Sequence, residues 1–240
     1  MRICTTPGLK FILSCAGPLS LDLNGIEVFF KSIFNAQPAL YDSTVIDVPW
    51  RQVPVKPTLK IGVVPASSIF PLHPPIQRAL DEAIALLKAQ GHQIVPLNEE
   101  DCRITEANEI AWNIFSLDQN AAKLIASVGE PPVPALGFIM KQLERLLQLS
   151  GTTLPDMSAL DRLGRLALLN TRRAELREAW RKLWVQHDLE ICIAPPAQNT
   201  ALPHDTFGVA PYTAFLNYLD VRYCFSLGSV TWEFADLVAL

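Results

Sequence analysis

The sequence predicts an α/β fold in which helices flank a short mixed or parallel sheet, and two observations lead to this class. A short apolar strand, an amphipathic helix and a second apolar strand follow one another within residues 59–97. That order is typical of a parallel strand pair joined by a right-handed crossover. Elsewhere the apolar residues recur mainly at helical spacing, so helices should outnumber strands.

The first predicted helix begins after Asp22, whose side chain is placed to cap the N-terminus. Behind that cap, apolar residues recur on one helical face: Leu23, Ile26, Phe29, Phe30 and Ile33. Pro38 should end the helix, because proline cannot continue one. A connection rich in proline follows, up to Pro57.

The strand–helix–strand unit starts with residues 59–64, a predicted strand that Pro65 stops. Pro74 suits the first turn of the helix, and Gly91 suits the position just after its end. The apolar face of this helix comprises Ile76, Leu80, Ile84 and Leu87. Residues 92–97 form the second predicted strand, which should pair with the first in parallel.

A run of helices is predicted next. Residues 105–126 read as one helix with these side chains inward: Ile110, Ile114, Leu117, Leu124 and Ile125. Residues 129–134, rich in proline, break the pattern. Another amphipathic helix follows, marked by Leu136, Ile139, Met140, Leu143 and Leu147.

Ser158, with Asp161 three residues later, is an N-terminal signature for a long helix that extends through Trp184. Arginines are spread along it: Arg162, Arg165, Arg172, Arg173, Arg177 and Arg181. They could bind an anion or a partner, but Glu175 and Glu178 are interleaved with them. We therefore expect a solvated face with salt bridges.

The last predicted elements are a strand and a helix. Residues 189–194 are apolar apart from Glu190, which indicates a strand buried on at least one face. Cys192, within it, should be an unreactive buried thiol. Pro211 then opens a helix with these apolar side chains: Tyr212, Phe215, Leu216 and Leu219.

Composition excludes several classes of protein. The chain has 240 residues, of which 50% are hydrophobic and 18% charged, and its formal net charge is −4. This charge gives no reason to expect nucleic acid or anionic lipid as a partner, and no apolar run is long enough to span a membrane. The five cysteines are scattered without a C-x-x-C pair, which argues against a structural metal site and favours a reducing compartment, the cytoplasm.

Three stretches carry a more specific resemblance. They are Gly17-Pro18-Leu19 with Pro38-Ala39-Leu40-Tyr41-Asp42 and Val48-Pro49-Trp50-Arg51; Leu59-Lys60-Ile61-Gly62-Val63 with His73-Pro74-Pro75-Ile76-Gln77-Arg78-Ala79-Leu80; and Ile193-Ala194-Pro195-Pro196 with Pro203-His204-Asp205, Tyr212-Thr213-Ala214 and Asn217-Tyr218-Leu219-Asp220. In this order and spacing they resemble the C-terminal region of the amidase signature family, in particular its fungal acetamidase-like branch. The resemblance covers about residues 16–220.

The resemblance implies an α/β/α fold around a mixed sheet and hydrolysis of a carboxylic amide to an acid and an amine or ammonia. It also implies a Ser–cis-Ser–Lys triad, no cofactor and no metal. In the family the nucleophilic serine belongs to a glycine-rich loop, whose backbone N–H groups stabilise the oxyanion. This sequence has no adjacent glycines, and its one Ser-Ser pair, Ser67-Ser68, follows a strand of a different region. No catalytic residue can be assigned, and we expect no amide hydrolysis by this chain alone.

The resemblance also indicates residues on the substrate side of the site. We predict substrate binding by Asp205, Tyr212, Thr213 and Asn217. The alternatives are ordinary structural roles: a loop shaped by His204-Asp205, a cap made by Thr213 and a buried hydrogen bond from Asn217.

We expect residues 1–240 to form a single domain, the C-terminal portion of an amidase-signature domain, with residues 1–14 and 226–240 departing from the family pattern. The rest of such a domain would add strands, so an unpaired sheet edge and an exposed apolar face are expected. A second copy or a partner chain would cover them. Two alternatives stay open: an interaction module without enzymatic activity, and a complementing subunit of a split amidase.

Overall fold

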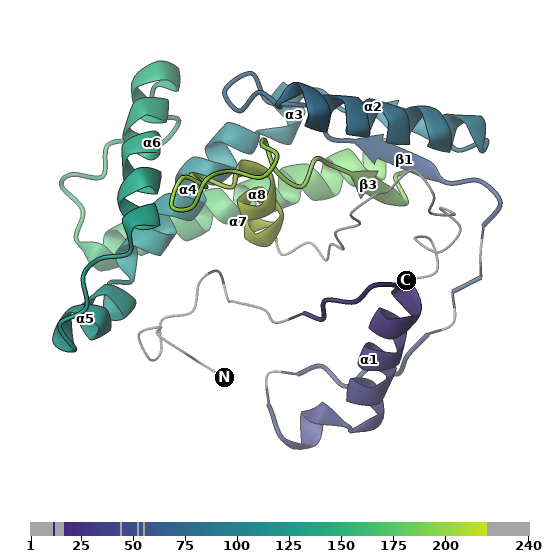
Figure 1. Ribbon diagram of the computed structural model, residues 1–240, viewed down its shortest axis with the longest axis horizontal. Helices are drawn as coiled ribbons and strands as arrows, with labels where there is room; N and C mark the ends of the chain where they lie inside the picture. The colour runs from purple at the N-terminus through teal and green to yellow at the C-terminus, as the bar shows by residue number, and fades with distance from the viewer. Residues whose placement is uncertain (1–11, 13–16, 44, 52, 55, 220–240) are drawn as a thin grey trace. The chain divides into compact units, whose positions relative to one another are not determined.

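The structure is a computed structural model that describes residues 12, 17–43, 45–51, 53–54 and 56–219 (Figure 1). Internal contacts divide the chain into two compact units. We call Met1–Leu13 with Leu59–Phe225 the core unit, and Ser14–Thr58 with Ser226–Leu240 the small unit. The expectation of a single domain stays a prediction.

The described part of the small unit contains α1 (Leu23–Asn35) and a short 3₁₀ helix, η1 (Pro38–Leu40). The predicted cap is confirmed, since Gly25 N donates to Asp22 Oδ1 at 2.7 Å. The α-helix ends at Asn35, before the predicted stop, and the proline begins the 3₁₀ turn instead. The Phe34 and Trp50 rings lie 6.0 Å apart, and Lys31 lies over the Trp50 ring.

The core unit contains a parallel sheet of three described strands in the order β2-β1-β3. These are β1 (Lys60–Val63), β2 (Gln93–Pro96) and β3 (Ile191–Ile193). In register, Ile61 lies opposite Ile94 on one side and Ile191 on the other. The predicted α/β class, and the parallel pairing of the first two strands, are confirmed.

Gly62 lets the central strand approach its neighbour closely. A Cβ atom at this position would lie 2.8 Å from Cys192 Sγ and 2.9 Å from a Leu189 methyl carbon. Ile61, beside it, is completely buried. The central strand therefore packs tightly against β3 and the segment that precedes it.

The crossover between β1 and β2 is α2 (Pro74–Ala89). Its end is a Schellman motif, in which His92 N donates to Leu87 O and Gly91 N donates to Lys88 O. Gly91 has a φ of +90°, a conformation that glycine adopts without a steric penalty. The predicted start and end of this helix are thus confirmed.

The predicted single helix over residues 105–126 is wrong. The chain forms α3 (Glu99–Cys102), α4 (Ile104–Leu117) and α5 (Asn120–Ser127). Asp118 interrupts the helix, because its backbone is extended and its Oδ1 accepts from Asn120 N at 3.0 Å. Leu124, expected to be inward, is 53% exposed.

Two longer helices follow, α6 (Pro134–Ser150) and α7 (Arg162–Gln186). On α6, Leu136 and Met140 are exposed, although the pattern placed both on its apolar face. The N-cap of α7 is Asp161, whose Oδ1 accepts from Gly164 N at 2.7 Å, and not Ser158 as predicted. The buried side chains of α7 are Leu169, Leu176, Trp180 and Leu183.

The arginines of α7 do more than form a solvated face. Arg181 pairs with Glu178 within the helix, as expected. Arg165, however, donates to the Met157 and Leu160 carbonyls, and Arg173 donates to Tyr218 O at 2.9 Å. These contacts fix the helix to neighbouring segments.

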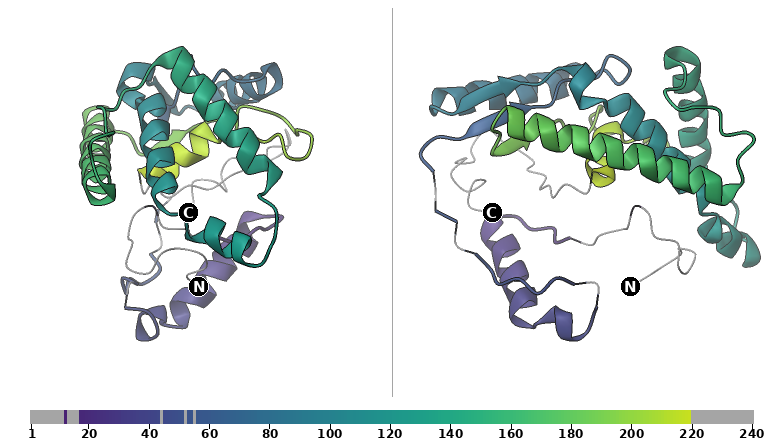
Figure 2. Two further views of the ribbon diagram at one scale, coloured as in Figure 1. Left: turned by 90° about the vertical axis from the view of Figure 1, so that its left-hand side faces the viewer. Right: turned by 180° about the vertical axis from the view of Figure 1, so that it is seen from behind.

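The core of this unit is centred on α4, which packs against both α8 (Pro211–Tyr218) and α7 (Figure 2). The Trp180 and Phe215 rings lie 5.0 Å apart, edge to face. Trp180 Nε1 also donates to Cys102 O at 3.0 Å, which satisfies a buried donor. None of the described helices combines the length and the apolar character needed to cross a lipid bilayer.

Candidate functional site

The carboxyl ends of the three parallel strands lie at one edge of the sheet, where open α/β sheets commonly bind ligands. The loops that leave this edge contact one another. His73 N, after β1, donates to Gln198 O, after β3, at 2.8 Å, and Gln198 Nε2 donates to Pro71 O at 3.3 Å. The candidate site is built on these loops.

A serine pair and a carboxylate form the polar centre of this edge. Ser67 Oγ donates to Glu99 Oε1 at 2.6 Å, and Ser68 donates to the same oxygen from its backbone N at 2.8 Å and from Oγ at 3.1 Å. The serines follow β1 and Glu99 begins α3, just after β2. One carboxylate oxygen therefore joins two loops of the edge.

Tyr212 closes the cluster from α8. Its hydroxyl accepts from Ser67 N at 2.9 Å and donates to Phe70 O at 2.8 Å, and the side chain is buried. Desolvation raises the pKa of Tyr212, so the phenol stays protonated. It acts as a fixed donor and acceptor that holds the loop after β1 against α8.

The chemistry open to this cluster is limited. Partial burial raises the pKa of Glu99, but the hydrogen bonds from Ser67 and Ser68 outweigh that effect and bring the pKa below its ordinary value. A carboxylate with a lowered pKa is a poor general base. In the described structure, the hydrogen-bond partners of the two serines include no lysine.

The four residues predicted to bind substrate differ in how far they are buried. Tyr212 is buried, Thr213 is half-buried and donates to Ala210 O at 3.3 Å, and Asn217 is exposed. Asp205 is exposed, with a φ of +63°, in a loop where Thr206 Oγ1 donates to Pro203 O at 2.7 Å. Their binding roles stay predictions.

Glu99 is the member of the cluster that the sequence pattern did not single out. An acidic residue at the start of a helix directly after a strand is a signal for such a site, since the helix start lies at the carboxyl edge. The signal is weak, because an acidic residue in a first turn is also explained by the helix dipole.

Neither cysteine of the described region is a candidate nucleophile. Burial raises the pKa of Cys102 to about 12 and that of Cys192 to about 12. At neutral pH both are thiols, and the thiolate is the nucleophilic form. The raised pKa agrees with the prediction of an unreactive Cys192, although the side chain is half-buried and not fully buried as expected. Among the described residues, no group of acidic, histidine and cysteine side chains is arranged to hold a metal ion.

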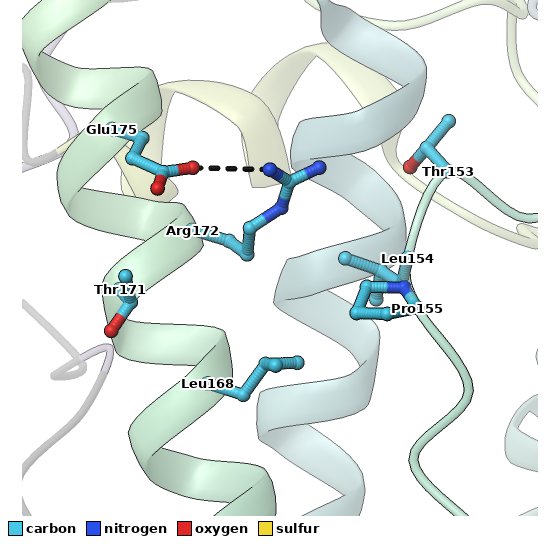
Figure 3. A pocket seen from close by; sticks show the side chains of 7 residues that line it. All are labelled: Thr153, Leu154, Pro155, Leu168, Thr171, Arg172 and Glu175. Carbon is cyan, nitrogen blue, oxygen red and sulfur yellow. Dashed lines mark hydrogen bonds and ion pairs between the residues drawn. The ribbon is translucent and has the colours of Figure 1, made fainter.

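A hollow of about 600 Å³ lies away from the sheet edge, against α7 (Figure 3). Seven side chains line it: Thr153, Leu154, Pro155, Leu168, Thr171, Arg172 and Glu175. Figure 3 shows the Arg172 guanidinium reaching from α7 towards α4, with its Nη1 3.1 Å from Glu175 Oε2. Its Nη2 lies 3.4 Å from Glu106 Oε1, and its Nε is buried without a hydrogen-bond partner.

Comparison with known proteins decides the family. The family model named Amidase matches residues 3–239. The chain belongs to the amidase family. An amidase of Gibberella moniliformis is 30% identical over 215 residues, and an acetamidase of Emericella nidulans is 25% identical over 229 residues. Each alignment covers 89% of this chain.

The fold is also that of a solved amide hydrolase structure. A solved structure of a fatty acid amide hydrolase superposes with a TM-score of 0.67 at 23% identity, over 85% of this chain. At that identity the likeness concerns the fold alone. This amidase-family chain spans 38% of the length of the Gibberella moniliformis relative, 39% of the Emericella nidulans relative and 34% of the solved structure. The predicted resemblance to the amidase signature family is confirmed.

Proposed function

We propose that this chain is the C-terminal portion of an amide hydrolase domain and does not hydrolyse amides by itself. The proposal rests on the hydrogen bonds made by the one pair of adjacent serines in the sequence. Ser67 and Ser68 both donate to the Glu99 carboxylate, an acceptor with a lowered pKa. A nucleophilic serine needs a base that removes its proton. A hydrogen-bonded carboxylate with a lowered pKa is too weak a base for that role.

The composition supports the same proposal. None of the 11 glycines is adjacent to another, so the sequence lacks the Gly-Gly pairs of the family's oxyanion loop. The chain also spans only 38% and 39% of the length of the Gibberella moniliformis and Emericella nidulans relatives. The proposed activity of the whole domain is hydrolysis of a small carboxylic amide to an acid and an amine or ammonia. Asp205, Tyr212, Thr213 and Asn217 are proposed to lie on the substrate side.

The test compares the chain alone with a chimera. In the chimera, this chain replaces the stretch of the Gibberella moniliformis amidase that it matches. We expect no acetamide turnover from the chain alone and no labelling by a fluorophosphonate probe, whereas the chimera turns acetamide over. The control is the relative with the same stretch deleted. Turnover by the chain alone that disappears in a Ser67→Ala, Ser68→Ala double variant would contradict the proposal.

A second candidate function is binding to another protein chain without catalysis. The exposed apolar side chains of the small unit favour it. No described residue among 17–58 is buried, and Leu19, Leu21 and Ile46 are exposed by 103%, 93% and 79%. In the core unit, β2 and β3 form the edges of the described sheet. We propose that a second copy or a partner chain covers these surfaces.

Sedimentation of the purified chain tests this second candidate. A stable dimer, or a complex with a co-expressed catalytic portion of the Gibberella moniliformis amidase, is the expected result. Val28→Lys, at a 63% exposed position of α1, should weaken that association. A monomer at every concentration, with and without the catalytic portion, would count against docking.

The proposed location is the cytoplasm, where five scattered cysteines would stay reduced. A fluorescent fusion that enters the secretory pathway would overturn this.

A further inference from the structure

One asparagine of the chain is followed directly by glycine, in the pair Asn24-Gly25 at the start of α1. The side-chain amide carbon of an asparagine can be attacked by the backbone nitrogen of the next residue. Glycine has no Cβ, so nothing on Gly25 hinders that attack. Both residues are exposed to water. Asn24 is therefore the asparagine at which the sequence most favours this reaction.

The N-terminal cap of α1 holds the nitrogen that would attack. Asp22 Oδ1 accepts from Gly25 N at 2.7 Å, and Asp22 N in turn donates to Ser20 Oγ at 3.4 Å. Asn24 lies within the helix, where the backbone torsions keep the next nitrogen away from the side-chain amide carbon. The reaction therefore requires the first turn of α1 to open and Gly25 N to leave Asp22.

Tertiary packing does little to prevent that opening. None of the residues of α1, Leu23–Asn35, is buried. Segments with few buried contacts open locally at a low cost in free energy. The bond from Gly25 N to Asp22 is thus a main local restraint on the first turn.

We propose that Asn24 is a deamidation site and that the Asp22 cap sets its rate. Gly25 N attacks Asn24 Cγ, the bond from Cγ to Nδ2 breaks, and Nδ2 leaves as ammonia with the proton of the attacking nitrogen. Water then opens the cyclic imide at one of its two carbonyl carbons and gives aspartate or isoaspartate. Water is the one co-reactant that these steps consume.

The two products should affect α1 in opposite ways. Aspartate places a carboxylate in the first turn, where the helix dipole favours a negative charge. Isoaspartate carries the backbone through its Cβ, which moves Gly25 N away from Asp22 and weakens the cap. The inference does not depend on the proposed function, because Asn24 and Asp22 take no part in it.

The experiment is incubation of the full chain at mildly alkaline pH, followed by digestion and peptide mass spectrometry. The mass gained when an amide becomes a carboxyl group reports deamidation at each asparagine. Asn24 should react first. Asn35, which is exposed in the same helix but is followed by Ala36, is the internal control. An intact Asn24 at the end of the incubation, or an Asn35 that reacts as fast, would overturn the inference.

Two variants test control by the cap. Asp22→Ala should speed deamidation of Asn24 about five-fold, because the first turn opens more often without its side-chain acceptor. Glu27→Gln is the matched control, since it also removes a carboxylate from α1 but only breaks the pair with Lys31, and should change the rate less than about two-fold.

Urea separates the cap from other effects of the substitution. In urea, where α1 is unfolded, the rates of the parent chain and both variants should converge. Equal rates for the folded parent chain and the folded Asp22 variant would refute control by the cap, and so would a difference that persists in urea.

Discussion

On α8 of the core unit, Phe215 and Tyr218 are completely buried, whereas on α1 of the small unit Phe29 is 42% and Ile33 39% exposed. Both helices carry apolar side chains at helical spacing. α8 has partners, since it packs on α4 and its Phe215 ring contacts Trp180. The comparison shows that an apolar stripe in the sequence identifies the side chains that a helix can bury. Whether they are buried depends on the elements that pack against the helix.

The largest expected effect comes from truncating the core of the α8 region. Phe215→Ala should lower the free energy of unfolding by about 4 kcal/mol, because it removes a buried ring and leaves a cavity beside Trp180. Phe29→Ala in the small unit should change it by less than about 0.5 kcal/mol. Urea unfolding followed by tryptophan fluorescence measures both. Equal losses would show that α1 is covered in solution.

Adding a methyl group sharpens the same contrast. Gly62→Ala should cost about 2 kcal/mol, because the new Cβ would lie within 3 Å of Cys192 Sγ and of Leu189. Gly17→Ala is the control in the small unit, where nothing lies within 4 Å of the added atom. Thermal unfolding of the two variants separates them. A stable Gly62 variant would mean that β1 and β3 are packed less closely.

Removing one hydroxyl tests the hydrogen bonds of the sheet edge. Tyr212→Phe leaves Ser67 N and Phe70 O without their partner and should cost about 2 kcal/mol. Tyr41→Phe, at an 85% exposed position in the small unit, should have no measurable effect. Urea unfolding gives the comparison. If the two variants unfold alike, water replaces the phenol at the sheet edge.

The smallest expected effect is on pH dependence. The folded pKa of Glu99 is lowered, so its contribution to stability is present above the ordinary carboxyl pKa of 4.5 and is lost as pH falls through the folded value. Glu99→Gln should therefore lose about 1 kcal/mol at pH 7 and differ less from the parent chain at pH 3. Unfolding free energies from pH 3 to pH 7 provide the measurement, with Glu100→Gln as the control. A constant difference across this range would refute the assignment.

The local signals were the most reliable part of the sequence. Asp22 caps α1, Pro74 begins α2 and Gly91 ends it, because caps and breakers act through the backbone within a few residues. Helical periodicity was less reliable. It ran through Asp118 without a break, because one extended residue does not disturb a pattern averaged over six turns.

The candidate site was predicted only in part. Tyr212 was selected through the family resemblance, and the structure places it in the polar cluster, while Asn217 lies on the exposed side of the same helix. Glu99 was missed because its partners Ser67 and Ser68 are about thirty residues away. A hydrogen bond between residues so far apart in the sequence depends on the register between β1 and β2. The sequence pattern does not predict that register.

The sequence alone determined the α/β class, the parallel pairing of the first two strands and membership of the amidase family. Those properties follow from local patterning and from motif order along the chain. Only the tertiary structure decided which apolar faces are covered, which serines donate to Glu99 and which carboxylates pair with Arg172. These depend on packing between segments far apart in the chain, since burial and pairing are properties of neighbours in space.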